Sequence, residues 1–306
     1  MDNVDKNKCL FLWLDANQFH AVEAKKRGIN VYQVYKNIPA VLKAVRRLQI
    51  EFGIPFISPW LSSWKHNLSD YTTVIIHASK IIPPVVKYIR KTNPKIRIIL
   101  WYWNPVNKCV ELDKFLGTNC ELWSFDEDDC VRFGLKYNTQ YYFKDVELLK
   151  NDKNIDVFFV GSDKGRLTYL IKLKSILDEY NISNYFHITP TGKKNPNYKI
   201  YYSKRIPYDE VLKYIASCKV IVDYVSENQR GLTLRPLEAL FFKKKLITND
   251  ETIVKRDFYR RENIFIIGKD NFKDLPEFIY SPYLEIDQEI VERYEFENWI
   301  SRFFES

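Results

Sequence analysis

The chain has 306 residues, 46% of them hydrophobic and 28% charged, a composition that excludes a disordered chain. Lys and Arg outnumber Asp and Glu by 47 to 39, and the net charge of +8 favours an anionic partner: a nucleotide, a nucleic acid or an anionic membrane surface. The longest apolar runs fall short of the roughly 20 residues of a membrane span, and the acidic N-terminus is unlike a signal peptide.

The five cysteines are scattered along the chain and form no C-x-x-C pair. Their odd number argues against a disulfide framework and indicates a reducing, cytoplasmic setting. With only four histidines and no His/Cys cluster, we expect no structural zinc site.

In the first half, short apolar runs alternate with amphipathic segments. We expect strands at 9–14, 54–57, 73–76, 96–102 and 122–125, and helices at 37–51, 83–91 and 128–133. The charged stretch 145–155 has no periodicity, and we place a domain boundary near residue 150.

The second half repeats the alternation. We expect strands at 156–160, 186–189, 220–224 and 245–248, and helices at 167–180, 208–217, 233–242 and 289–304. This order predicts an α/β protein with two Rossmann-like, doubly wound parallel-sheet domains facing a cleft. The expected domains are 1–150 and 151–286, followed by a terminal helical segment, 287–306. Ligands bind such sheets at the carboxyl ends of the strands.

The stretch 219–250 carries the strongest functional pattern. A buried strand leads through a loop to a helix with Thr233 as N-cap, where the N–H groups of Gly231, Leu232 and Thr233 suit a diphosphate. Arg235 can add a phosphate contact, and Glu238 can accept the hydroxyls of a ribose. The alternative is an ordinary capped helix with a solvated Arg and Glu.

This segment, GLTLRPLEALFFKKKLITND, resembles the donor-binding region of GT-B glycosyltransferases, particularly bacterial enzymes of capsule, lipopolysaccharide or exopolysaccharide assembly. DVFFVGSDKGRL resembles the first strand and phosphate-facing loop of their C-terminal domain, and the closing helix through Trp299 resembles the one that crosses back to the first domain. The resemblance implies a metal-independent hexosyltransferase that moves a sugar from a nucleotide diphosphate sugar, UDP-linked, to a glycan or lipid-linked acceptor.

One feature departs from many retaining enzymes of this fold, which carry two glutamates separated by seven residues. Eight positions before Glu238 stands Arg230, and Glu227 comes too early. The stereochemical outcome is therefore left unassigned.

The loop after the expected strand 156–160 is the second candidate donor contact. Gly161 permits a close backbone approach, and Lys164 and Arg166 can neutralise phosphate charge. Arg205, before a helix, is a weaker candidate for a nucleobase contact. A solvated loop and a basic surface pair are the alternatives.

In the first domain, Asp15 and His77 each follow an expected strand, and His20 lies close to Asp15 in sequence. These three residues are the candidates for a catalytic base or a sugar contact. A histidine in this place is often structural, and an aspartate often caps the next helix.

Three other readings compete with these sites. Asp126–Asp129 could bind a metal, but the acids precede a helix, where the helix dipole favours them, and this explanation is preferred. Lys243–Lys245 could meet nucleic acid, although a solvated helix end is preferred. Trp60–Trp64, with Lys65 and His66, could rest on an anionic membrane at the inner face of the plasma membrane, or could be an aromatic loop packed on its own domain.

We therefore expect a nucleotide-sugar donor and a glycan or lipid-linked acceptor as partners, with no nucleic acid and no cofactor. The alternatives are another nucleotide-linked transferase or epimerase of the same fold, or a non-catalytic nucleotide- or nucleic-acid-binding protein.

Overall fold

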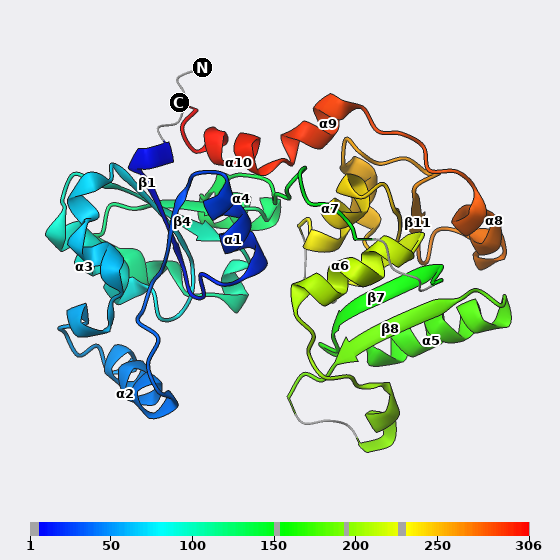
Figure 1. Ribbon diagram of the computed structural model, residues 1–306, viewed down its shortest axis with the longest axis horizontal. Helices are drawn as coiled ribbons and strands as arrows, with labels where there is room; N and C mark the ends of the chain where they lie inside the picture. The colour runs from blue at the N-terminus through cyan, green and yellow to red at the C-terminus, as the bar shows by residue number, and fades with distance from the viewer. Residues whose placement is uncertain (1–5, 150–153, 193–195, 226–230, 306) are drawn as a thin grey trace. The chain divides into compact units, whose positions relative to one another are not determined.

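The computed structural model describes residues 6–149, 154–192, 196–225 and 231–305 (Figure 1). Its contacts divide the chain into two compact units, unit 1 (Met1–Thr139 with Ile300–Ser306) and unit 2 (Gln140–Trp299). The segment before residue 150, which we expected in the first domain, falls in unit 2 because Tyr141 packs on Trp299 with ring centroids 4.2 Å apart.

Unit 1 contains one parallel sheet of six strands, in the order β2-β1-β3-β4-β5-β6. Its strands are β1 (Cys9–Trp13), β2 (Asn30–Gln33), β3 (Thr73–His77), β4 (Arg97–Tyr102), β5 (Glu121–Ser124) and β6 (Lys136–Tyr137). The alternation of side chains divides the buried strands between two faces. Leu10, Leu12 and Ile76 belong to a core built with α3, whereas Trp13 and His77 lie on the opposite face.

The helices of unit 1 begin where the sequence supplies start signals. They are α1 (Phe19–Lys26), α2 (Ala40–Glu51), α3 (Pro83–Thr92) and α4 (Glu127–Phe133). The two prolines of α3 lie in its first turn, where a missing N–H costs nothing. The side chain of Asp126 caps α4 by accepting the N–H of Asp129 at 3.2 Å, and Gly134 ends the helix at φ 65°.

The strand expected at 54–57 is wrong. Phe56 has a φ of 68°, which an extended strand does not permit, and Ile57 instead caps a short 3-10 turn. Of the two readings of Trp60–Trp64, the packing of Trp64 supports an aromatic loop held against its own unit: Trp64 is fully buried, and its indole N–H donates to the Val34 carbonyl at 2.9 Å.

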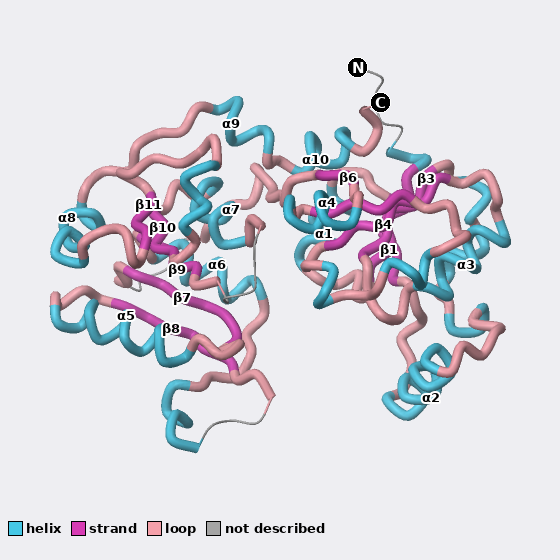
Figure 2. Tube along the Cα trace, turned by 180° about the vertical axis from the view of Figure 1, so that it is seen from behind, coloured by secondary structure: helices cyan, strands magenta, loops and turns pink. Residues whose placement is uncertain are grey.

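Unit 2 contains a parallel sheet of five strands, in the order β11-β10-β9-β7-β8 (Figure 2). Its strands are β7 (Val157–Ser162), β8 (Asn184–Thr189), β9 (Val220–Asp223), β10 (Lys245–Thr248) and β11 (Ile264–Ile266). Its helices are α5 (Leu167–Glu179), α6 (Tyr208–Ser217), α7 (Leu234–Phe241), α8 (Leu275–Tyr280) and α9 (Gln288–Arg293). Two parallel-sheet α/β units confirm the expected fold class.

The closing segment consists of two helices rather than the single one expected. α9 ends before Tyr294, and α10 spans Phe296–Arg302, because Glu295 is buried and accepts the N–H of Glu297 at 2.6 Å. The last residues return to unit 1, where the ring of Phe303 lies 4.9 Å from that of Trp123. Arg302 also donates to Asn138 at 2.7 Å.

Each sheet has one point at which the strand order reverses. The chain passes from β1 to β2 and then crosses to β3 on the other side of β1. In unit 2 it passes from β7 to β8 and then to β9 on the other side of β7. Ligands of open α/β sheets bind outside the carboxyl ends of the strands at such a switch point. The topology therefore predicts ligand sites at the ends of β1 and β3 and at the ends of β7 and β9.

The cysteines are free thiols, as expected. Cys9 in β1 and Cys218 after α6 are buried, with 1% and 2% of their surface exposed. Within the described parts of the chain, the helices all lack the combination of length and apolar character that a bilayer crossing needs.

Candidate functional site

Four charged side chains meet at the switch point of unit 2. Asp223 ends β9, Arg166 precedes α5, and Arg235 and Glu238 lie one turn apart on α7. Arg166 and Arg235 both interact electrostatically with Asp223 and with each other. Two guanidinium groups thus lie at the strand ends where the topology predicts a ligand.

Glu238 lies at the bottom of this cluster, with no exposed surface. One carboxylate oxygen accepts the hydroxyl of Tyr208 at 2.5 Å, and the other is paired with Arg235. Tyr208 is in turn 2.7 Å from the hydroxyl of Tyr142. Burial raises the pKa of Glu238, and the charge of Arg235 acts in the opposite direction. A ribose hydroxyl would have to replace one of these bonds to reach the carboxylate.

Arg235 connects this buried pair to the surface, since 18% of its side chain is exposed. Burial disfavours its charge, but Glu238, Tyr208 and Asp223 together offset that cost and raise its pKa. One N–H of the guanidinium bonds Glu238. A guanidinium has five N–H donors, so donors remain for a phosphate oxygen.

Arg166 folds back over Gly161 at the end of β7. Its guanidinium lies 5.1 Å from the ring centre of Phe159, and it donates to the carbonyl groups of Tyr224 and Ser162. A Cβ on Gly161 would come within 2.7 Å of this guanidinium, so the missing side chain makes room for Arg166. Burial lowers the pKa of Arg166.

Asp223 is 5% exposed, and its carboxylate accepts the hydroxyl of Thr233 at 2.5 Å. Burial raises its pKa, against the opposite effects of Thr233 and the two arginines. Thr233 occupies the N-cap position of α7, as expected, but its hydroxyl bonds this strand end rather than the helix. The bond fixes the start of α7 to the end of β9.

The loop between β7 and α5 uses its own N–H groups. Asp163 accepts the N–H groups of Gly165 and Leu167 at 3.1 and 3.2 Å, and the N–H of Lys164 donates to Thr191 at 3.0 Å. These three N–H groups are therefore already bonded within the protein, and the loop leads directly into the first turn of α5. Lys164 is exposed, so its ammonium group is the part of this loop that is accessible to an anion.

The other expected donor contacts lie nearby with less defined surroundings. Gly231 has a φ of 86°, and Leu232 is buried. Arg205 is exposed in the loop before α6, the helix that begins with Tyr208. Glu227 and Arg230, the two positions compared above with the glutamate pair of retaining enzymes, lie outside the described residues.

The switch point of unit 1 is aromatic rather than charged. The ring of His77, at the end of β3, lies 4.2 Å from that of Trp13 and 5.2 Å from that of Trp103. Its Nε2 atom is buried and has no hydrogen-bond partner among the described residues. Burial, together with His20, lowers the pKa of His77 to about 3, so its imidazole is neutral at physiological pH.

His20 and Asp15 lie at the same end of the sheet. The ring of His20, in α1, is 5.2 Å from that of Trp103. Asp15 is exposed just after β1 and accepts the N–H of Asn17 at 3.0 Å. The structure therefore brings His20 and His77 together in an aromatic cluster and leaves the Asp15 carboxylate open to solvent.

Two competing readings find structural explanations. In Asp126–Asp129, Asp126 caps α4 and Asp129 accepts the N–H of Val106 at 2.7 Å; within the described ranges, no group of His, Cys, Asp and Glu is suited to a metal. Lys243–Lys245 were expected to form a solvated helix end. For Lys245 this expectation is wrong, because the residue belongs to β10, is 3% exposed and donates to Ser281 at 2.6 Å.

Comparisons with known proteins agree at the level of the fold. Neither a protein-family profile nor a curated protein matches the sequence. Among solved structures, the chain is similar to the apo form of the lipopolysaccharide outer core galactosyltransferase WaaB, with a TM-score of 0.50 and 16% identity over 96% of this chain and 87% of that one.

Two further structures have comparable similarity. The first is the UDP-forming α,α-trehalose-phosphate synthase from Burkholderia xenovorans, with a TM-score of 0.53 and 12% identity over 88% of this chain and 78% of that one. The second is a UDP-N-acetylglucosamine 2-epimerase structure from Listeria monocytogenes, with a TM-score of 0.51 and 7% identity over 97% and 95%. Together with the two parallel sheets, these similarities show the GT-B fold.

Several residues of the two switch points were not expected from sequence. They are Trp13, Trp103, Tyr142, Tyr208 and Asp223. Asp223 had an available signal, since an acidic residue ends a buried strand there. Tyr142 had none, because it is 66 residues from Tyr208 in sequence.

Proposed function

We propose that the chain is a glycosyltransferase that moves a hexosyl group from a UDP-linked sugar to a hydroxyl of a glycan or lipid-linked oligosaccharide. The observation that carries the proposal is the convergence of Arg166, Arg235 and the start of α7 at the switch point of unit 2. The GT-B fold, shared with a UDP-forming synthase, supports the same choice of donor.

In this reaction, negative charge grows on the departing nucleoside diphosphate. The guanidinium groups of Arg166 and Arg235, with the positive end of α7, stabilise that charge without reorganising. The exposed Lys164 adds a third cation at the edge of the loop after β7. We propose that these groups serve in place of a divalent metal.

The aromatic switch point of unit 1 suits the acceptor. Trp103 is partly exposed and offers an apolar ring face to a sugar, whereas Trp13 is buried beside it. The Nε2 of His77 is buried, so a turn of its ring toward solvent would let it bond a sugar hydroxyl. A neutral imidazole with a pKa near 3 is a weak proton acceptor, so we assign it to sugar contact. The open carboxylate of Asp15 is our candidate for the base that deprotonates the acceptor hydroxyl.

The first test is thermal unfolding with UDP, GDP, CDP, dTDP and ADP, each with and without Mn²⁺. A ligand at 100 times its dissociation constant adds about 2.7 kcal/mol to the stability, which raises Tm by a few degrees. We expect a selective, metal-independent shift with UDP. The shift should fall in Arg235→Lys, which keeps a charge, and persist in Lys172→Ala on the far side of α5. A shift that requires Mn²⁺ would contradict the proposal.

Turnover is the second test. With a panel of UDP-sugars and oligosaccharide acceptors, we expect release of UDP that depends on the acceptor. Conversion of UDP-N-acetylglucosamine without an acceptor would support an epimerase instead, a reading that the Listeria structure favours. A response to duplex DNA that falls steeply with salt, without a UDP response, would support a nucleic-acid-binding protein.

We also propose a setting for this activity. The sequence resemblance and the similarity to the lipopolysaccharide enzyme WaaB support the assembly of a bacterial surface glycan in the cytoplasm, at the inner face of the plasma membrane.

A further inference from the structure

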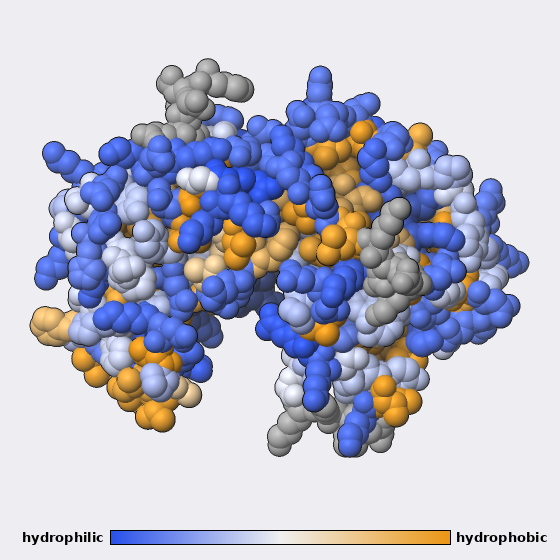
Figure 3. Space-filling model, viewed as in Figure 1, coloured by the Kyte–Doolittle hydropathy of each residue, from blue (hydrophilic) through white to orange (hydrophobic). Residues whose placement is uncertain are grey.

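Helix α2 turns its apolar stripe away from the protein. Val41, Val45, Leu48 and Phe52 recur at intervals of three and four residues, which places them on one helix face. They are 75%, 47%, 53% and 74% exposed. Figure 3 shows apolar side chains gathered over this helix.

The side of α2 that packs on unit 1 is instead partly polar. The guanidinium of Arg46 lies 4.2 Å from the ring centre of Tyr35, and Gln49 accepts the indole N–H of Trp60 at 2.6 Å. The usual orientation of an amphipathic surface helix is therefore inverted. Exposed apolar stripes of this kind mark interaction surfaces.

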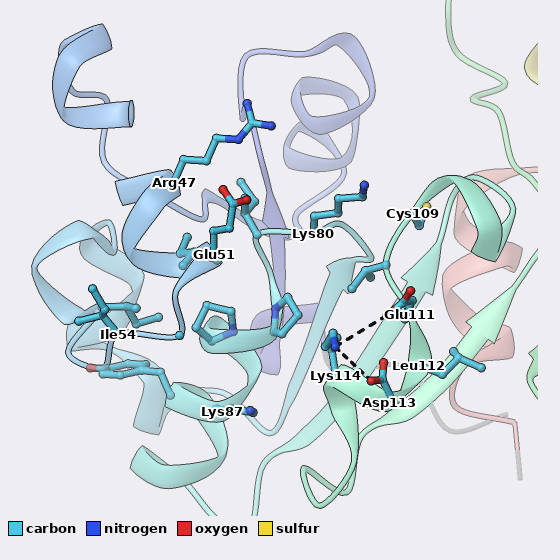
Figure 4. Close-up of a pocket in the computed structure, with 18 of the residues that line it drawn as sticks. Arg47, Glu51, Ile54, Lys80, Lys87, Cys109, Glu111, Leu112, Asp113 and Lys114 are labelled. Carbon is cyan, nitrogen blue, oxygen red and sulfur yellow. Dashed lines mark hydrogen bonds and ion pairs between the residues drawn. The ribbon is translucent and has the colours of Figure 1, made fainter. Parts of the chain in front are cut away.

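The apolar surface continues from α2 into a cavity of about 1690 Å³ in unit 1. After Phe52 the chain passes through Ile54 and Phe56, which are 53% and 85% exposed and line the cavity. Ile81 and Leu112 line it as well. Figure 4 shows Ile54 and Leu112 on opposite sides of the hollow.

The lining of this cavity has more positive than negative charge. Its cations are Arg47, Lys80, Lys87, Lys91, Lys114 and Arg132, and its acids are Glu51, Glu111 and Asp113. Lys114 is paired with both Glu111 and Asp113, at 3.7 and 3.1 Å. Within the described chain, Lys80, Lys87 and Lys91 form no ion pair. An anion at the cavity would supply the negative charge that these cations lack.

We propose that the α2 stripe and this cavity together form a binding surface for an anionic lipid bilayer. The stripe enters the boundary between headgroups and acyl chains, and the cations of the cavity contact the phosphate of an anionic lipid. An apolar helix face beside Lys and Arg is the arrangement of interfacial helices. The inference deepens the proposed function, on which it rests in one respect: an acceptor anchored in that bilayer would be brought to unit 1.

A second copy of the chain is a poorer occupant than a bilayer. In a twofold dimer through this surface, each residue would face its counterpart region on the partner. The excess of cations would then meet the same excess, without a compensating acidic patch on the lining. Charge complementarity therefore selects an anionic surface over self-association.

The test is co-sedimentation of the full chain with two kinds of vesicle, one of phosphatidylcholine and one of an equal mixture of phosphatidylcholine and phosphatidylglycerol. We expect binding to the mixed vesicles that weakens with salt. Leu48→Asp should weaken it by more than about tenfold, and each of Lys87→Glu and Lys91→Glu by roughly fivefold. Ile200→Asp, an equally simple change at an 87% exposed apolar residue of unit 2, should leave it unchanged.

These outcomes separate the inference from its alternatives. Absence of binding to the mixed vesicles at low salt, or an equal loss in Ile200→Asp, would overturn it. So would a dimer that Leu48→Asp dissociates without any vesicle binding. The UDP-induced rise in Tm reports on unit 2 and should be the same in Leu48→Asp. Vesicle binding without a UDP response would retain the lipid surface and reject the glycosyltransferase proposal.

Discussion

The two switch points have the same topology and opposite chemistry. In unit 2 the ends of β7 and β9 lie beside Arg166, Asp223 and the buried pair Arg235 and Glu238. In unit 1 the ends of β1 and β3 carry aromatic rings, with His77 held neutral. In the proposed function, the fold sets where each ligand binds, and the residues after each strand set which ligand it is. The charged strand ends would then take the diphosphate, and the aromatic ones the sugar.

The largest expected effect on stability comes from breaking the charged pair of unit 2. Arg235→Ala leaves the carboxylate of Glu238 buried without a counter-charge, with the Tyr208 hydroxyl as its remaining hydrogen-bond donor, which should lower the free energy of unfolding by about 3–5 kcal/mol. Urea denaturation measures the change, and Lys172→Ala, at an exposed position on α5, is the control. A loss no larger than in the control would show that the pair is not essential at these strand ends.

A somewhat smaller loss should follow Gly161→Ala. The added Cβ would lie 2.7 Å from the Arg166 guanidinium and 3.1 Å from the Phe159 ring, an overpacking that costs about 1–3 kcal/mol. The UDP-induced rise in Tm should shrink because Arg166 is displaced. The double variant with Arg166→Ala should lose less than the sum of the single variants. Additive losses would contradict the contact.

The aromatic strand ends should respond to pH. The pKa of His77 is lowered from its usual 6.5 to about 3, so the unfolded chain binds more protons than the folded one between these values. Stability is therefore complete above pH 6.5 and falls by up to about 1.4 kcal/mol per pH unit as the pH drops toward 3. Urea midpoints at pH 7 and pH 5 measure the slope. His77→Gln should flatten it, and an unchanged slope would place the cause elsewhere.

The smallest effect on stability is expected at Asp15. Asp15→Asn keeps an oxygen for the N–H of Asn17 at an exposed position, so the unfolding free energy should change by less than about 0.5 kcal/mol. If Asp15 is the base, kcat should nevertheless fall by roughly 10²–10⁴. Asp70→Asn, at another exposed aspartate of unit 1, should change neither quantity. An unchanged kcat in Asp15→Asn would exclude Asp15 as the base.

The order of strands and helices could be read from the sequence because buried parallel strands are continuous apolar runs. The prolines of α3, the acids of α4 and the cap at Thr233 also marked helix starts correctly. The edge strand Asn30–Gln33 was missed because it mixes polar and apolar residues. Its pattern is too short to stand out.

The direction in which a helix turns its apolar face could not be predicted from the sequence. Periodicity shows that α2 has an apolar face, but the pattern is identical whether that face meets the core or the solvent. Packing of Arg46 on Tyr35 decides the outcome, and that contact depends on the tertiary structure. The break at Tyr294 has the same kind of cause, because the buried Glu295 is bonded locally.

For the candidate site, sequence could indicate residue types at strand ends but not their pairing. Arg235 and Glu238 were expected to face a ligand separately, and the structure pairs them with each other and with Tyr208. Tyr208 lies 30 residues before Glu238, so local patterns carry no trace of the contact. The aromatic neighbours of His77 were likewise hidden in separate strands and loops.

The positions of the cysteines allow the opening of each unit to be followed through the reactivity of its own thiols. Burial raises the pKa of Cys9 and of Cys218 to about 12, so both sulfurs are protonated and unreactive until the surrounding structure opens. Cys218 is the single cysteine of unit 2, whereas the other four belong to unit 1. Alkylation followed by peptide mass analysis therefore measures the opening of each unit separately in one sample, with no cysteine introduced by mutation.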